Sequence, residues 1–429
     1  MPKTPLKRFI LVLVVFFTFW QMVIMLLPVT SYLPNQVFIY VLNLTYITVV
    51  LLSFFFFLYI FVQHHHYDKS SFCRSEKEFP VGRQLKFNIS IASFGGILGF
   101  LLILYDRVVV RGIDYSAGLR AARYEWLRES TGGSIFSVVG NLIIPFCYVA
   151  IFYLIVYKHS LTRGQRFFLT SSALCGVVGH AILNGGRSNV LIAIFIVLII
   201  LIFNVKKSTY DINVKKTKNR FGVYFILVIV ATFIIGLTLQ SAQLANISMV
   251  ELLRLGISSL YGQATENFEY IDNDIVAMVV YMMSYIFHGS WTAEAVYSLA
   301  DKPGSYLLYP ISVIGSSLGI VTRPIELGFF SESGAFLSLP GAMYYDFGFT
   351  GVIILSLILG WASAAAVYYL SYKRVTLIGF GIALYPIVIL LMSPILPAYG
   401  LIYFNFVVYA FIINGVINVL FFGKRLHWI

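Results

Sequence analysis

Long apolar runs separated by short polar segments form the dominant pattern along the 429-residue chain. A helix that crosses a bilayer needs about 20 mostly apolar residues, because the hydrocarbon core is about 30 Å thick and each helical residue rises about 1.5 Å. Ten segments satisfy this requirement, and an even number places both chain ends on the same side. The predicted spans are 9–28, 38–62, 89–105, 136–156, 167–184, 189–205, 221–239, 350–370, 376–392 and 401–422.

The stretch 275–299 is apolar as well, but it contains His288, Trp291 and Glu294, so we interpret it as a helix in the membrane interface. The composition agrees with a membrane protein, since 59% of the residues are hydrophobic and 11% are charged, against about a quarter charged in soluble domains. It excludes a soluble globular protein and a disordered chain. We therefore expect an all-α polytopic membrane protein, with residues 1–429 forming a single transmembrane domain.

The formal net charge of +12 takes on a narrower meaning once the charges are placed on this topology. If the N-terminus is cytosolic, 21 of the 30 Lys and Arg residues lie on the cytosolic side, together with only four of the 18 acidic residues. Cytosolic loops of membrane proteins are enriched in Lys and Arg. The distribution therefore predicts that both termini are cytosolic, and it gives no reason to expect a nucleic-acid partner.

Two segments on the predicted external side, 106–135 and 240–349, are longer than a simple connector needs to be. Connections of more than about 15 residues are usually functional or disordered. Both segments are rich in aromatic residues and Gly, and neither contains a low-complexity tract, which argues against disorder. We expect 106–135 to form a first external loop and 240–349 to form a large external loop with interfacial helices.

The basic residues of the predicted external side are almost all arginine, with Lys302 as the only lysine. A rigid guanidinium fork suits bidentate phosphate binding better than an ammonium group does, so this bias predicts anion sites. The alternative is that each arginine pairs with a carboxylate close in sequence, such as Asp106, Asp114, Glu125 or Glu129. The arginines are Arg107, Arg111, Arg120, Arg123, Arg128, Arg187, Arg254 and Arg323.

Arg187 has the most informative context, because it lies between two predicted spans in the amide-rich segment 180–189. Charged residues in or beside the membrane are costly and are functional by default. The two preceding glycines allow a ligand to approach the backbone closely, and Ser188 and Asn189 can cap the next helix, whose N-terminus favours an anion. We predict that Arg187 binds phosphate. The alternative is a tight turn whose arginine reaches a lipid phosphate.

A second candidate site lies near the end of the large loop, where Arg323 is followed by Glu326 and Glu332. A carboxylate beside a sugar hydroxyl can act as a general base, and an arginine can stabilise a departing phosphate. We predict Glu326 or Glu332 as the catalytic carboxylate, and Arg323 and Arg254 as phosphate-binding residues. The alternatives are an Arg–Glu pair in a structured loop and an intrahelical pair of Glu251 with Arg254.

Aromatic residues are frequent on the predicted external side, and Trp291, Tyr344 and Tyr345 are the candidates for sugar binding. Their flat faces and polar tips suit sugar rings, but they suit the membrane interface equally well. The tract 64–66 is three histidines in a basic cytosolic loop without further ligands nearby. No Asp-rich, His/Glu or Gly-Lys-Ser/Thr motif occurs, so we expect neither a metal nor a nucleotide cofactor.

Several of these features resemble the bacterial oligosaccharide repeat-unit polymerases, the Wzy-type O-antigen and enterobacterial common antigen polymerases. Segment 182–191, Ile-Leu-Asn-Gly-Gly-Arg-Ser-Asn-Val-Leu, resembles the family's Gly-Gly-x-Arg-type turn before an apolar span. The large loop before the last three spans contains Arg323-Pro, and Gly348-Phe-Thr-Gly351 resembles the Gly-x-x-Gly segment that begins the next helix in the family.

Some of these polymerases have an arginine, ten residues and a glycine in each of two external loops. Arg107 with Gly118 and Arg323 with Gly334 both fit that spacing, one in each large loop. The related O-antigen ligases have a His-Asn pair before the Gly-x-x-Gly segment, whereas this chain has Ser-Gly at 333–334. The resemblance therefore favours a polymerase over a ligase.

The resemblance implies a glycosyltransferase of the bacterial cytoplasmic (inner) membrane with a GT-C-like fold. Its substrate would be a polyprenyl-diphosphate-linked oligosaccharide, whose glycan is transferred to the terminal sugar of a new repeat unit on the external face. Membrane lipids and a chain-length regulator would be its partners. Arginines would replace a divalent metal in stabilising the diphosphate, with Arg187 and Arg323 as a clamp and Arg254 assisting.

Two other functional classes remain open. A transporter or flippase of lipid-linked oligosaccharide would also need arginines and aromatic residues near the interface, but we expect it to place charge along a central cavity. A scaffold without catalysis would explain neither Arg187 nor the two large loops. Sugar identity and linkage are not encoded in any motif that we find.

Overall fold

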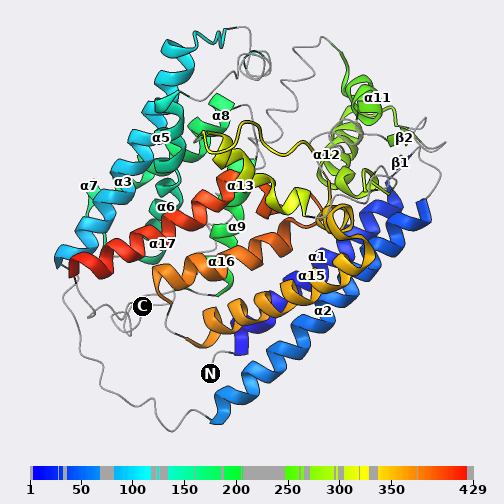
Figure 1. The fold of residues 1–429 in the computed structure, drawn as a ribbon, viewed down its shortest axis with the longest axis horizontal. Helices are drawn as coiled ribbons and strands as arrows, with labels where there is room; N and C mark the ends of the chain where they lie inside the picture. Colours follow the sequence, from blue (N-terminus) through cyan, green and yellow to red (C-terminus); the bar gives the residue numbers. More distant parts are fainter. Residues whose placement is uncertain are drawn as a thin grey trace.

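The computed structural model describes residues 3–27, 29–31, 36–67, 82–116, 122, 125, 134–158, 160–184, 188–203, 205, 247–259, 262–264, 271–293, 296–297, 304–317, 319–327, 337–373 and 375–422. These residues are almost entirely helical (Figure 1). The α-helices are α1 Lys3–Leu26, α2 Gln36–Tyr67, α3 Gly82–Tyr105, α5 Ile135–Ile143, α6 Phe146–Val156, α7 Arg163–Ala173, α8 His180–Asn184, α9 Ser188–Ile202, α11 Met249–Ser259, α12 Asp274–Trp291, α13 Ser305–Ser317, α15 Leu339–Tyr372, α16 Leu377–Met392 and α17 Ile402–Phe422.

Within the described residues, three short helices of other types interrupt this pattern. Two are π-helices, η2 Asp106–Val110 and η3 Leu174–Gly179, and one is a 3₁₀-helix, η6 Ala398–Gly400. A small antiparallel sheet pairs β1 Val29–Ser31 with β2 Gly262–Ala264. It ties the end of α1 to the segment that follows α11.

Seven helical segments of the described chain are long and apolar enough to cross a membrane, which identifies a polytopic membrane protein. They coincide with seven of the ten predicted spans. The predicted spans 189–205 and 376–392 are present as the shorter apolar helices α9 and α16, of 15 and 16 residues. Helices of that length reach only about 23–24 Å. The remaining predicted span, 221–239, lies outside the described residues.

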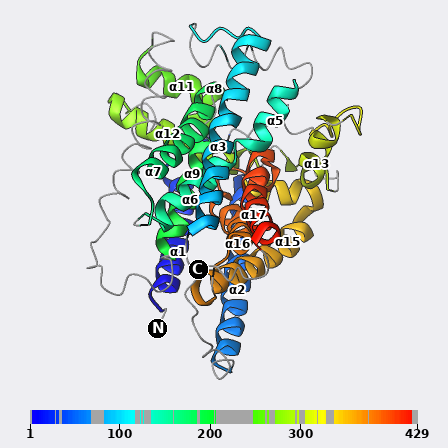
Figure 2. The same cartoon turned by 90° about the vertical axis from the view of Figure 1, so that its left-hand side faces the viewer.

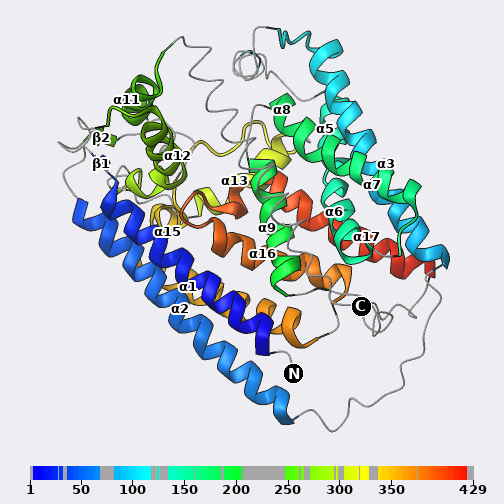
Figure 3. The same cartoon turned by 180° about the vertical axis from the view of Figure 1, so that it is seen from behind.

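The helices form two groups joined by a third, as Figures 1 and 3 show. α1, α2 and α15 lie on one flank, with α2 packed along α15. α3, α5, α6 and α7 form the other flank. Between the flanks, α9 contacts both α6 and α16, while α17 contacts α3, α6 and α16. Phe152, Phe380 and Phe411 meet there, with ring centroids 4.8–5.9 Å apart, and form part of the main core.

The contact between α2 and α15 depends on a small residue. A Cβ atom at Gly360 of α15 would lie 2.6 Å from the backbone oxygen of Val50 in α2. One turn away, the Ser53 hydroxyl donates a hydrogen bond of 2.7 Å to the backbone oxygen of Leu357. Small residues and polar side-chain contacts of this kind allow membrane helices to approach closely.

The helix α15 begins at Leu339, so the predicted boundary between the large loop and a span starting at 350 is wrong. Ser338 caps the helix and Pro340 lies in its first turn. This earlier part of the helix contains a charged residue, Asp346. It is buried, however, and accepts hydrogen bonds of 2.7 and 2.9 Å from the backbone N–H groups of Tyr306 and Leu307, at the start of α13.

A kink divides α15 two residues after Asp346. Gly348 has φ 62° and ψ −163°, a backbone conformation that only glycine adopts readily. This glycine is the first of the Gly348–Gly351 pair that resembles the polymerase family. The kink separates a buried first segment, 339–346, from the long apolar segment that follows.

The stretch predicted as an interfacial helix corresponds to α12, which packs against α11. Its first half exposes Ile275, Val276 and Val279, while its second half is buried at His288 and Trp291. The Trp20 indole N–H of α1 donates a 3.0 Å hydrogen bond to the hydroxyl of Ser290 in this buried half. Figure 2 places α11, α8 and the C-terminal end of α3 on the opposite side of the molecule from the start of α1.

Candidate functional site

Five polar residues meet just beyond the C-terminal end of α3, and we call them the Arg107 cluster: Asp106, Arg107, His180, Asn184 and Asn189. Asp106 is fully buried, Arg107 is 2% exposed and His180 is 1% exposed. They come from η2, from α8 and from the start of α9, so the cluster joins two segments more than 70 residues apart. Charged residues are almost never buried unless they are paired, and this burial therefore requires partners.

Both π-helices of the described chain border this cluster. η2 contains Asp106 and Arg107, and η3 ends at Gly179, directly before His180. A π-helix widens one turn of an α-helix and is found disproportionately at functional sites. After η2 the chain turns at Gly112, whose φ of 64° lies in the left-handed region. The charged side chains and the imidazole of the cluster therefore lie at, or directly after, local departures from α-helical geometry.

Asp106 is shared between two arginines. Its Oδ2 atom lies 3.5 Å from Arg107 Nη1 and 3.1 Å from Arg111 Nε, and its Oδ1 atom accepts a hydrogen bond from the hydroxyl of Ser134. This confirms, for Arg107 and Arg111, the alternative that first-loop arginines pair with a nearby carboxylate. Asp106 therefore restrains both guanidinium groups, one on each side of its Oδ2 atom.

A chain of hydrogen bonds runs from Arg107 across the cluster. Arg107 Nη2 donates to Asn184 Oδ1 at 3.3 Å. Asn184 Nδ2 lies 2.6 Å from His180 Nε2, and Asn189 Nδ2 lies 2.9 Å from His180 Nδ1. A neutral imidazole has one acceptor and one donor nitrogen. The Asn184 oxygen accepts from Arg107, so the Asn184 amide nitrogen donates to His180 Nε2. His180 then carries its hydrogen on Nδ1. The Asn189 amide is therefore assigned with its oxygen facing Nδ1, where it accepts that hydrogen.

Three tyrosines surround this hydrogen-bonded chain. Tyr115 donates a 2.9 Å hydrogen bond to the backbone oxygen of Leu183, and Tyr148 donates a 2.9 Å bond to the backbone oxygen of Asn189. The ring of Tyr403 in α17 packs on the His180 ring at 4.9 Å. Burial raises the pKa of Tyr115 above its usual value, so its phenol remains a neutral donor. The two tyrosine hydrogen bonds hold the backbone at Leu183 and at Asn189.

The Arg107 cluster has the chemistry of an anion site. A guanidinium group in a low-dielectric setting interacts with a negative charge far more strongly than one in water. Its fork geometry matches the oxygens of a phosphate. His180, Asn184 and Asn189 contribute no charge as neutral groups, so they orient Arg107 without competing for its charge.

The predicted phosphate-binding residues do not assemble in the described part of the chain. Arg187 and Glu332 lie outside the described residues, although both neighbours of 185–187, Asn184 and Ser188, are described. Arg254 on α11, and Arg323 and Glu326 after α13, are exposed. Neither Arg254 nor Arg323 forms an ion pair or a hydrogen bond with the Arg107 cluster. The structure forms neither the suggested pair of Glu251 with Arg254 nor a pair of Arg323 with Glu326, while Glu332, the other carboxylate near Arg323, lies outside the described residues.

The three aromatic residues predicted to bind sugar are packed inside the protein. Trp291 is 2% exposed and lies in a small core between α11 and α12. Tyr345 is fully buried. Tyr344 is 9% exposed and packs against Phe38, with ring centroids 4.9 Å apart. In this structure their faces are covered by protein side chains, and their predicted role in sugar binding remains a prediction.

Part of the cluster has a detectable signal in the sequence, although its residues are not among the predicted site residues. Asp106 and Arg107 stand between apolar segments, after Leu-Leu-Ile-Leu-Tyr and before Val-Val-Val. A charged pair within such a run is itself a functional signal in a membrane protein. His180 and Asn189 were part of the amide-rich context of Arg187, but nothing in the sequence indicated that Arg107 would contact them.

Within the described residues, no group of three or more His, Cys, Asp and Glu side chains gathers in a geometry that could hold a metal ion. The polar groups that make up the Arg107 cluster are one carboxylate, one guanidinium, two amides and one imidazole. Comparisons with protein-family models, with curated proteins and with solved structures found no match for this chain.

Proposed function

We propose that the chain joins polyprenyl-diphosphate-linked oligosaccharide repeat units into a surface polysaccharide such as O-antigen. The observation that supports this most is the position of Arg107, a buried arginine that is hydrogen-bonded to Asn184, the residue directly before the Gly-Gly-Arg sequence at 185–187. That sequence carries the resemblance to the polymerases. Arg107 also begins one of the two Arg…Gly spacings of the sequence.

The reaction is a glycosyl transfer. The hydroxyl oxygen of the acceptor's terminal sugar attacks the anomeric carbon of the donor glycan, and the bond between that carbon and the diphosphate oxygen breaks. Polyprenyl diphosphate leaves with the electron pair, while the hydroxyl proton passes to a carboxylate and then to water. Glu326 and Glu332 are the candidates for that carboxylate. No redox partner and no nucleotide is consumed.

In this proposal, the Arg107 cluster stabilises the diphosphate. Charge on the bridging oxygen grows as the bond breaks, and preorganised donors aimed at developing charge are the largest contribution to many enzymatic rate enhancements. Asp106 and Asn184 restrain the guanidinium group of Arg107 before the substrate binds. Arg187 and Arg323 remain predicted members of the clamp, although Arg323 forms no ion pair or hydrogen bond with the Arg107 cluster in the structure.

The variant Arg107→Lys tests the proposal in a deletion strain, with the length distribution of surface glycan chains as readout. Lysine keeps the charge but loses the fork, and a charged hydrogen bond contributes about 1.5–3 kcal/mol, which corresponds to at least about a tenfold loss in rate. We expect long chains to disappear. Arg163→Lys, an exposed site at the start of α7, is the matched control and should retain the wild-type ladder.

Two further variants test the rest of the clamp. Arg187→Lys and Arg323→Lys should shorten the chains in the same manner. A full-length ladder from either variant would remove that residue from the clamp, and a full-length ladder from Arg107→Lys would remove the cluster from the reaction. Western blotting of the membrane fraction shows whether each variant is present at the wild-type level.

A further inference from the structure

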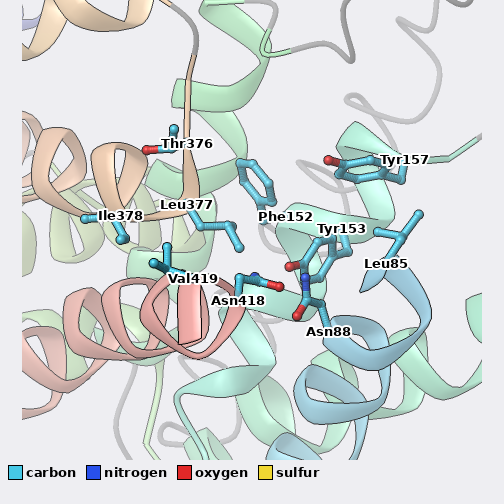
Figure 4. A pocket seen from close by; sticks show the side chains of 11 residues that line it. Leu85, Asn88, Phe152, Tyr153, Tyr157, Thr376, Leu377, Ile378, Asn418 and Val419 are labelled. Atoms are coloured by element: carbon cyan, nitrogen blue, oxygen red, sulfur yellow. The ribbon is translucent and has the colours of Figure 1, made fainter. Parts of the chain in front are cut away.

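A cavity of about 100 Å³ lies at the other end of α3, between α3, α6, α16 and α17 (Figure 4). Asn88 of α3 is 18 residues before Asp106, which places the two sites about 27 Å apart along the helix. The cavity is therefore distinct from the Arg107 cluster. Its lining residues are Leu85, Asn88, Phe152, Tyr153, Tyr157, Thr376, Leu377, Ile378, Gly415, Asn418 and Val419.

The lining residues lie close to the ends of their helices. Leu85 is in the first turn of α3, Tyr157 directly follows the last residue of α6, and Thr376 caps the start of α16. The amide groups of Asn88 and Asn418 lie deeper, and Figure 4 shows them pointing toward each other and toward Tyr153. The cavity is thus located where membrane helices meet the interface, with its polar groups on the inner side.

Several buried amide atoms in and beside this cavity lack a hydrogen-bond partner among the described residues. They are Asn88 Oδ1, Asn414 Nδ2 and Asn418 Oδ1. Tyr153 donates a 3.2 Å bond to Asn414 Oδ1, and Asn418 Nδ2 donates a 2.9 Å bond to the backbone oxygen of Asn414, so the amides are held in place. Buried amides without partners are costly, and inside a membrane protein they point to a missing ligand or to ordered water.

The donor and acceptor character of these atoms limits the chemical class of ligand that the cavity can bind. Two are acceptors and one is a donor, and a hydroxyl group can satisfy both kinds. Among the described residues that line the cavity there is no Asp, Glu, Lys or Arg, and these residues would leave a bound ion uncompensated in a low-dielectric site. The volume is several times what one water molecule needs. The rings of Phe152 and Tyr153 provide apolar faces suited to carbon-bound hydrogens.

We propose that this cavity binds a small neutral polyol group, which is supplied either by a hydroxylated lipid head group or by a free polyol. The exposed residues Lys86 and Lys158 are direct sequence neighbours of the lining residues Leu85 and Tyr157. Positive charge at this end attracts anionic lipids. A glycerol head group on an anionic phospholipid combines both properties.

The experiment measures ligand binding to the purified full chain in detergent by native mass spectrometry and by the shift of the unfolding temperature. The lipid arm compares phosphatidylglycerol with phosphatidic acid, which is anionic but lacks the glycerol head group. The free arm uses glycerol at millimolar concentration, below the range in which it acts as a general stabiliser. We expect saturable binding of phosphatidylglycerol at least tenfold tighter than that of phosphatidic acid, or a saturable effect of free glycerol.

The variants separate a ligand site from simple helix packing. Asn88→Leu should weaken the binding at least tenfold. Asn43→Leu is the matched control, because Asn43 is a fully buried amide of α2 outside the cavity whose side-chain atoms also lack partners, and it should leave binding unchanged. If Asn88→Leu does not fold, Val419→Phe fills the space while keeping every amide. Equal binding of both lipids without a glycerol effect, or wild-type binding by the Asn88→Leu and Val419→Phe variants, would overturn the proposal and leave ordered water as the occupant.

Discussion

Arg107 is a charged residue kept inside a largely apolar setting, and its neighbours explain how this is tolerated. Asp106 supplies the opposite charge at 3.5 Å, and Asn184 supplies a neutral acceptor at 3.3 Å. Replacing such a buried pair by apolar residues is often neutral or stabilising, so stability alone does not account for it. At the level of single residues, we therefore interpret the pair as functional.

The amide of Asn184 provides a test that keeps the shape of the site. In Asn184→Asp, a carboxylate would lie beside Arg107 and pair with it, which removes the guanidinium from the substrate. The donor to His180 Nε2 is lost, and the imidazole hydrogen moves to Nε2 and donates to the new carboxylate. We expect at least about a tenfold loss of chain elongation, equivalent to roughly 1.4 kcal/mol, with no loss of folded protein. Glycan ladders and thermal unfolding measure the two properties.

Asn273→Asp is the control for that substitution. Asn273 caps α12 through its Oδ1 atom, and aspartate is an equally good cap, so this variant should behave as wild type. Normal elongation by Asn184→Asp would show that Arg107 does not need to be available to an anion. That result would argue for a purely structural ion pair.

At the level of elements, the helices were largely predictable from the sequence, but their interruptions were not. Apolar length is a local property, so seven predicted spans coincide with long apolar helices, although the one predicted to start at 350 begins at Leu339. The π-helices at 106–110 and 174–179 arise from hydrogen-bond register, which hydropathy does not encode. The start of α15 lies before the predicted span, and the backbone groups that satisfy Asp346 there belong to the first turn of α13, 40 residues away in sequence.

The kink in α15 leads to a stability prediction. A Cβ atom at Gly348 would meet no atom within 4 Å, so Gly348→Ala creates no clash and its cost comes from the backbone conformation alone. We expect it to lower the free energy of unfolding by about 1–3 kcal/mol, measured by thermal or denaturant unfolding in detergent.

Gly164→Ala provides the matched comparison in α7. A Cβ atom there also meets nothing within 4 Å, and the backbone is in an ordinary conformation, so alanine should be neutral or slightly stabilising. Equal effects of the two substitutions would mean that the conformation at Gly348 is not strained for alanine. In that case, the kink would not depend on glycine.

For the whole molecule, the structure separates two polar sites at opposite ends of α3. The Arg107 cluster lies beyond its C-terminal end, and the amide-lined cavity lies at its N-terminal end. Local sequence indicated the first in part, through the charged pair in an apolar run and the amides around 185–187. It could not indicate the second, because Asn88 and Asn418 are brought together only by the contact between α3 and α17.

The predicted orientation places the Arg107 cluster on the external side, with both termini in the cytosol. The excess of Lys and Arg in the segments at the opposite end is the basis for that prediction. An external site is also where a lipid-linked repeat unit would be polymerised. Orientation and function are therefore linked predictions.

The central claim is that the chain elongates lipid-linked glycans, and reconstitution tests it most directly. The purified full chain in liposomes is given polyprenyl-diphosphate-linked repeat units, and the products are separated by size. We predict elongated lipid-linked glycan from the wild type and from Arg163→Lys, and at least about tenfold less from Arg107→Lys. The amount of free polyprenyl diphosphate released should be proportional to the number of repeat units joined. Movement of the lipid-linked units across the bilayer without any elongation would contradict the account and identify a transporter.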